Sequence, residues 1–208
     1  MKLMPPVTAD DYSWQNDWED IYTVTFVRGH DERETLRRFG IAQADMRPYD
    51  WEGIWERVEE TDGESDLVVV THVNGWTLAF EACGWEGNRP ETLRELSRGG
   101  EAVSVMRHDY AASHHFAHAV EGELRTAFRP DWPRERWGAR PDALNADLRE
   151  LGLTPSGPQE ESRYRRETVA PALALASRLS GVLFHRDMVE SDALLGGVIT
   201  SPVPDDPR

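Results

Sequence analysis

The chain has 208 residues, 39% of them apolar, and its 38 acidic and 23 basic residues give a net charge of −15. This length suits a single domain with one sizeable core. So acidic a surface repels nucleic-acid phosphates and argues against a nucleic-acid partner. No apolar run approaches the roughly 20 residues that cross a bilayer, and the first residues lack the pattern of a secretory signal. We therefore expect a cytoplasmic protein with no membrane partner.

A single cysteine, Cys83, and a single lysine, Lys2, stand out in the composition. One cysteine cannot form an internal disulfide, so we interpret Cys83 as a small buried residue at a strand end. The near absence of lysine among the basic residues fits the codon bias of a GC-rich bacterial genome.

The first third of the chain predicts one strand and two helices. Residues 20–28 are rich in β-branched and aromatic side chains, which is typical of a strand. Asp31 with Glu34 three positions later favours a helix start, and Gly40 suits the end of that helix. A second helix is predicted from Asp50, because four apolar residues follow at the spacing i, i+3, i+4 and i+7.

Two strand-like runs flank the pair Asn74-Gly75, which is the preferred sequence of a two-residue hairpin turn. Placing Val73 opposite Trp76 fixes which side chains share a face. The expected core face carries Val69, Thr71, Val73, Trp76, Leu78 and Phe80, and Glu81 falls on the other face.

Beyond the hairpin, a glycine-rich loop leads to Pro90, which suits the first position of a helix that ends at Gly99-Gly100. Further strands are expected at 102–106, 115–120 and 123–128, the last two joined by a turn at Glu121-Gly122.

The last third predicts mainly irregular and helical structure. Residues 129–140 are interpreted as an ordered loop, and a short helix follows from Asp142. A helix over 160–179 should break or kink near Pro171, which lacks a backbone donor. A final helix is expected near 187–195.

Together these patterns predict an α+β fold: a largely antiparallel sheet of about five strands with interposed helices and a helical C-terminal segment. The expected organisation is an N-terminal tail (1–11), an α+β core (12–151), a linker-like loop (152–159), C-terminal helices packed on the core (160–196) and a tail (197–208).

Two runs, WTLAFEACGWEGNRPETLRELSRGGEAVSV and FRPDWPRERWGARPDAL, resemble an actinobacterial protein family catalogued as a domain of unknown function. The likeness extends from about Tyr12 to Phe184. It implies compact bacterial domains from conflict or regulatory gene clusters, and it implies no activity, cofactor or catalytic residue.

A cluster of histidines raises the question of a metal site, because imidazole is a common zinc ligand. His108, His114, His115 and His118 lie within eleven residues. On a strand, residues four apart are separated by roughly 13 Å and cannot share an ion. We therefore expect no metal and no cofactor.

The loop 84–90 is the candidate ligand site. It joins a strand to a helix N-terminus, whose free N–H groups suit an anion. Glu81, Trp85 and Arg89 are the candidate ligand-binding residues. The alternative is a tight turn that needs its glycines for positive φ and Trp85 for packing.

A second candidate surface lies in the proline-rich segment that holds Trp132, Arg136 and Trp137. Aromatic side chains in irregular segments form recognition surfaces or fasten loops to the core. The first hypothesis is therefore a non-enzymatic protein-binding module of a bacterial conflict or regulatory system, immunity-, antitoxin- or regulator-like, which attracts a basic protein partner. The alternative is a small-molecule-binding enzyme or sensor with its site at the 84–90 loop.

Overall fold

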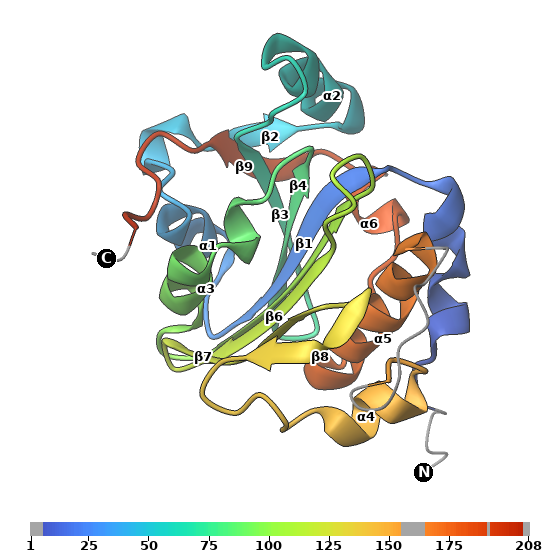
Figure 1. Cartoon of the computed structure of the whole chain (residues 1–208). Coiled ribbons are helices and arrows are strands. Elements are labelled where there is room, and N and C mark those ends of the chain that lie inside the picture. Colours follow the sequence, from blue (N-terminus) through green and yellow to red (C-terminus); the bar gives the residue numbers. More distant parts are fainter. Residues whose placement is uncertain (1–5, 155–164, 191, 206–208) are drawn as a thin grey trace.

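The computed structural model describes residues 6–154, 165–190 and 192–205. These residues form one antiparallel sheet of nine strands in the order β2-β9-β3-β4-β1-β5-β6-β7-β8, with helices on both faces (Figure 1). The strands are β1 Ile21–Arg28, β2 Arg47–Tyr49, β3 Leu67–Val73, β4 Trp76–Ala82, β5 Glu101–His108, β6 His115–Val120, β7 Glu123–Arg129, β8 Trp132–Trp137 and β9 Leu194–Val198.

The helices form two layers. On one face lie α1 and α3, and on the other lie α5 and the 3-10 segment η1 (Figure 1). The α-helices are α1 Glu32–Arg38, α2 Trp51–Glu60, α3 Pro90–Ser97, α4 Asn145–Glu150, α5 Val169–Ser180 and α6 Asp187–Glu190; the 3-10 segments are η1 Ala9–Asp17, η2 Gln43–Asp45, η3 Glu86–Asn88 and η4 Arg165–Thr168.

The expected sheet of about five strands followed by a helical C-terminal segment is wrong. Strands β2, β8 and β9 are not indicated by their sequences, and the helices α5 and α6 are followed by a strand that pairs between β2 and β3. The expected helix near 187–195 ends at Glu190. In β9, Gly196 lies so close to β3 that a Cβ would be 2.7 Å from the Val68 carbonyl oxygen. Residues 194–198 form a strand because they pair with β2 and β3, which are distant in sequence.

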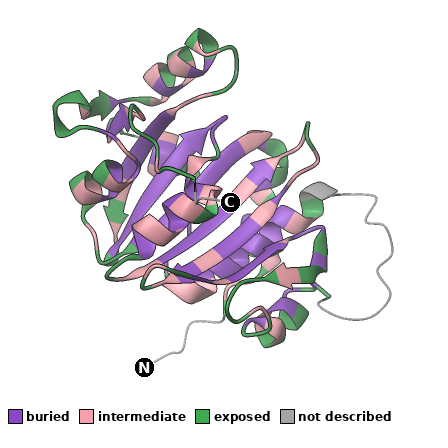
Figure 2. Ribbon diagram, turned by 60° about the vertical axis from the view of Figure 1, so that its left-hand side comes forward, coloured by how far each residue is buried: buried purple, intermediate pink, exposed green. Residues whose placement is uncertain are grey.

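The predicted hairpin is confirmed. Val73 pairs with Trp76, and the turn residues Asn74 and Gly75 have φ of 51° and 81°. Trp76 is only 5% exposed. The face that carries Glu81 is also buried, because the sheet is covered on both sides (Figure 2).

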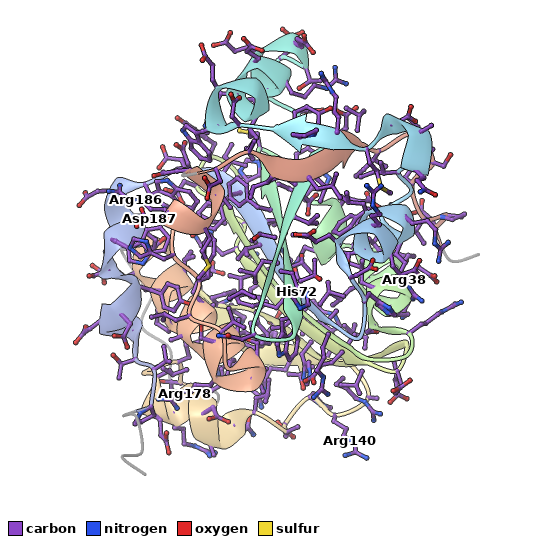
Figure 3. All side chains as sticks on the ribbon, turned by 180° about the vertical axis from the view of Figure 1, so that it is seen from behind. Arg38, His72, Arg140, Arg178, Arg186 and Asp187 are labelled. Atoms are coloured by element: carbon purple, nitrogen blue, oxygen red, sulfur yellow. The ribbon has the colours of Figure 1, made fainter. Side chains whose placement is uncertain are left out.

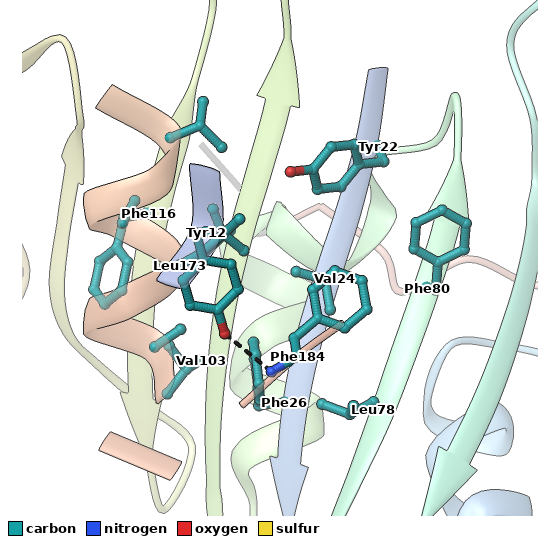
Figure 4. Close-up of a cluster of buried hydrophobic side chains, with 14 of the residues drawn as sticks. Tyr12, Tyr22, Val24, Phe26, Leu78, Phe80, Val103, Phe116, Leu173 and Phe184 are labelled. Carbon is teal, nitrogen blue, oxygen red and sulfur yellow. Dashed lines mark hydrogen bonds between the residues drawn. The ribbon is translucent and has the colours of Figure 1, made fainter. Parts of the chain in front are cut away.

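The first face of the sheet holds the aromatic core. Tyr22 and Phe26 from β1 and Phe80 from β4 are among the buried side chains that pack under η1 and α5 (Figure 4). The Tyr12 hydroxyl accepts a hydrogen bond from the Phe184 amide at 2.9 Å and bonds the Ser177 hydroxyl. This bond network fastens η1 to α5 and to the chain that follows it.

α5 is also tied to α4. The guanidinium of Arg178 lies 2.9 Å from the Glu150 carboxylate at the contact of the two helices (Figure 3). Pro171 falls in the first turn of α5, where a missing donor costs no helical hydrogen bond, so α5 continues through it. The start expected at residue 160 and most of the 152–159 loop lie outside the described residues. No helix within the described ranges is long and apolar enough to cross a membrane.

The second face is lined by smaller side chains. Under α1 and α3, strands β4, β6 and β7 present Ala79, Ala117, Ala119 and Ala127. Leu93 and Leu96 of α3 cover part of this surface. These small residues leave space beside the start of α3, and the candidate site lies in this space.

Candidate functional site

A cavity of about 260 Å³ lies between the loop that precedes α3 and strands β5 to β8. We call it the aromatic pocket. One wall is formed by Trp85, Asn88, Arg89 and Pro90 of the loop, and the floor includes Met106, His115, Ala117 and Ala127, with Trp137 on the opposite side.

Two tryptophans flank this pocket and remain partly open to solvent. Trp85 is 41% exposed and Trp137 is 42% exposed, although 52 positions separate them in the sequence. The sequence analysis treated the 84–90 loop and the segment with Trp137 as two separate surfaces. Both line one cavity: the loop contributes Trp85 and Arg89, and the second segment contributes Trp137. An apolar cavity with exposed aromatic edges is suited to enclosing an apolar group.

The other candidate residues have different positions. Trp132 does not line the pocket. Arg136 bonds the Pro133 carbonyl oxygen at 2.6 Å and the Asp142 carboxylate at 2.5 Å, and its side chain is only 11% exposed. Arg136 therefore stabilises the β8 segment and connects it to Asp142.

Glu81 lies beneath the loop and is 1% exposed. One carboxylate oxygen accepts the Glu86 amide at 2.7 Å, and the other accepts the Gly87 amide at 2.9 Å. Burial raises the pKa of Glu81 to about 8, and the two amide hydrogen bonds oppose that rise. Glu81 does not line the pocket; it positions the loop that does.

The loop packs so closely on Glu81 that it requires glycine. A Cβ on Gly87 would lie 2.4 Å from the Thr25 hydroxyl oxygen and 2.7 Å from a Glu81 oxygen. The φ of Gly87 is not in the left-handed region, so the requirement is steric. This contact explains a carboxylate in an otherwise apolar strand.

Arg89 and two amides of the loop are engaged within the chain. Glu81 takes the Glu86 and Gly87 amides. Arg89 lies 2.7 Å from the Glu86 carboxylate and 2.5 Å from Asp205, and it also bonds the Val203 carbonyl oxygen. The chain's own carboxylates therefore engage Arg89 and both of these amides.

Two neutral polar side chains line the pocket. The amide nitrogen of Asn88 donates to the Ser104 hydroxyl at 3.2 Å. Burial is the main cause that lowers the pKa of His115, and the guanidinium of Arg129 adds to it, so His115 is uncharged at neutral pH. The His115 ring lies edge-on to Trp137 at 6.4 Å. No nucleophile paired with a base is found among the residues that line this cavity.

The histidine cluster is divided among separate contacts. His114 is buried and its Nδ1 accepts the His108 amide at 3.2 Å, whereas His118 lies 2.8 Å from Glu101. In the described ranges no three His, Cys, Asp or Glu side chains are grouped so that they could hold a metal ion.

Sequence reasoning missed the floor of the pocket. Met106, Ala117 and Ala127 come from three strands and meet only in the folded sheet. The small residues at alternate positions 117 and 119 are the available signal, since they leave room on one face.

Comparison with curated proteins gives no match, and comparison with solved structures gives none. The family model described as a family of unknown function, DUF6461, matches residues 5–203. The chain therefore belongs to the DUF6461 family.

Proposed function

We propose that this protein is a non-enzymatic binding module that recognises a protein partner by enclosing one apolar side chain of that partner in the aromatic pocket. The observation that supports the proposal is the cavity between Trp85 and Trp137, two indoles that are each about two-fifths exposed. Interfaces concentrate their binding energy in aromatic residues around such cavities.

The charge of the chain supports a basic partner. The 38 acidic residues outnumber the 23 basic ones and give the chain a net charge of −15, so the protein carries a negative field. Such a field raises the association rate of a basic protein and weakens as salt increases. The net negative charge would then steer the partner, and the pocket would hold it.

We place this module in the cytoplasm of an actinobacterium or another bacterium with a GC-rich genome, in a conflict or regulatory system. Supporting observations are the scarcity of lysine, with Lys2 alone, and the single cysteine, Cys83, which needs no oxidising compartment.

A small-molecule ligand is the second candidate. The cavity of about 260 Å³ is larger than the cavity of about 150 Å³ that accepts benzene in an engineered protein. Asn88 and His115 would supply polar contacts to a neutral ligand. These features favour a planar, uncharged molecule if the occupant is not a side chain.

The test compares capture of a protein partner from the native host by the wild-type chain and by Trp85→Ala and Trp137→Ala. Each pocket variant should lose about 2 kcal/mol or more of binding, roughly a 30-fold drop in affinity. Trp132→Ala removes a tryptophan that does not line the pocket and serves as the matched control.

Unchanged capture by both pocket variants, with folded protein shown by circular dichroism, refutes the proposal. A retained small molecule without any protein partner replaces it with the second candidate.

A further inference from the structure

A second hollow adjoins the aromatic pocket. It measures about 260 Å³ and is lined by Glu64, Ser65, Asp66, Trp85, Glu86, Ile199 and Pro202. We call it the acidic hollow. Trp85 lines both cavities, so one indole separates an apolar site from an acidic one.

The three carboxylates of the acidic hollow differ in their partners. Arg57 binds Asp66 with two hydrogen bonds of 2.9 and 3.0 Å. Glu86 is bonded by Arg89 at 2.7 Å. Glu64 is exposed, and the described part of the chain provides no ion pair to its carboxylate. One negative charge therefore remains available to a cation from outside.

The walls of the hollow are held before any partner arrives. The Ile199 amide donates to the Asp66 carbonyl oxygen at 2.9 Å, which keeps the C-terminal segment against the loop after α2. On the other side, Glu81 holds the loop that carries Trp85. Sites formed in advance lose less entropy on binding.

We propose that the partner presents an apolar side chain to the aromatic pocket and, close to it in the same segment, an arginine or lysine to the acidic hollow. The two side chains would lie on either side of Trp85, with the cation over the indole and beside Glu64. Cations bind favourably to indole faces and to carboxylates. This inference rests on the proposed function, and it specifies the chemistry of the partner.

Capped peptides that contain one tryptophan and one arginine, separated by one or two glycines, are suitable probes. Matched peptides replace arginine by the neutral citrulline, or tryptophan by alanine. Methyl labels on Met106, Ala117 and Ala127 report on the aromatic pocket, and the Ile199 methyls report on the acidic hollow. Nuclear magnetic resonance titration gives the affinity and the site together.

The tryptophan–arginine peptide should shift both sets of methyls, and the citrulline peptide should bind about twofold to fivefold more weakly, as expected of a partly exposed ion pair. Glu64→Gln should remove that difference between the peptides. Glu52→Gln, which removes an equal charge from the exposed face of α2, should preserve it.

Equal affinity of the arginine and citrulline peptides, or unmoved Ile199 methyls while the pocket methyls shift, overturns the inference and leaves the pocket proposal standing. If no peptide shifts Met106, Ala117 and Ala127, both proposals fail.

Discussion

Replacing Glu81 by glutamine should make the free energy of unfolding less dependent on pH, because glutamine does not ionise. The Glu81 carboxylate is 1% exposed, and its two oxygens accept the amides of Glu86 and Gly87. A glutamine retains one acceptor and turns its NH₂ group toward the other amide. The loss of one buried hydrogen bond costs about 1–3 kcal/mol at any pH.

The wild-type protein is destabilised in a different way, by ionisation of the buried Glu81 carboxyl group as pH rises. Burial raises the pKa of Glu81 from 4.5 to about 8 in the folded state. The folded state therefore binds the proton more tightly than the unfolded chain, and stability falls as pH rises from about 4.5 to about 8. At about 1.4 kcal/mol per pKa unit, the full loss is about 5 kcal/mol above pH 8.

Urea unfolding of both proteins at several pH values between 5 and 9 measures the difference in free energy of unfolding. Subtracting the variant from the wild type cancels the other titrating groups. The wild type should be the more stable protein near pH 5, and the variant should be the more stable one near pH 9. A constant difference, or a wild type that gains stability relative to the variant as pH rises, would refute the reasoning, because the amide bonds would then outweigh burial.

Two further substitutions test the packing around the site and the opposite face. Gly87→Ala places a Cβ 2.4 Å from the Thr25 hydroxyl oxygen, so it should lower the thermal midpoint and displace Trp85, as seen by a crystal structure; an unchanged loop contradicts this. Arg107→Met removes a fully buried guanidinium that bonds Asp109 at 2.8 and 3.0 Å, and it should cost about 3–5 kcal/mol in urea unfolding. A loss below about 1 kcal/mol would show that this buried pair contributes little.

Local patterns predicted the elements whose structure is decided by neighbours in sequence. Asn74-Gly75 fixes its hairpin because both residues adopt positive φ and the register follows from the turn. Asp31 and Asp50 accept the amides of Glu34 and Gly53, as expected of helix N-caps.

Elements decided by distant partners were not predictable. β9 contains Gly196 and Gly197, and glycine has low strand propensity. It forms a strand because it pairs antiparallel with β2 on one side and β3 on the other. β8 includes Pro133 and pairs irregularly with β7, so it lacks the alternation of a regular strand.

The candidate site was predictable only in part. Trp85, Arg89 and Trp137 are indicated by residue type and by their irregular segments. Their meeting depends on the order β5-β6-β7-β8, which brings Trp137 across the sheet toward the loop before α3. The role of Glu81 requires the positions of two backbone amides that no sequence pattern gives.

Site-specific photo-crosslinking in the native host tests the central claim most directly. A benzophenone amino acid at position 135 replaces an exposed residue of β8 two positions before Trp137 and leaves both pocket tryptophans in place. The same residue at position 183 replaces a leucine that is 47% exposed beyond α5. We predict that position 135 crosslinks to one basic protein and that position 183 does not. No crosslinked protein at position 135, or the same products from both positions, would contradict the account.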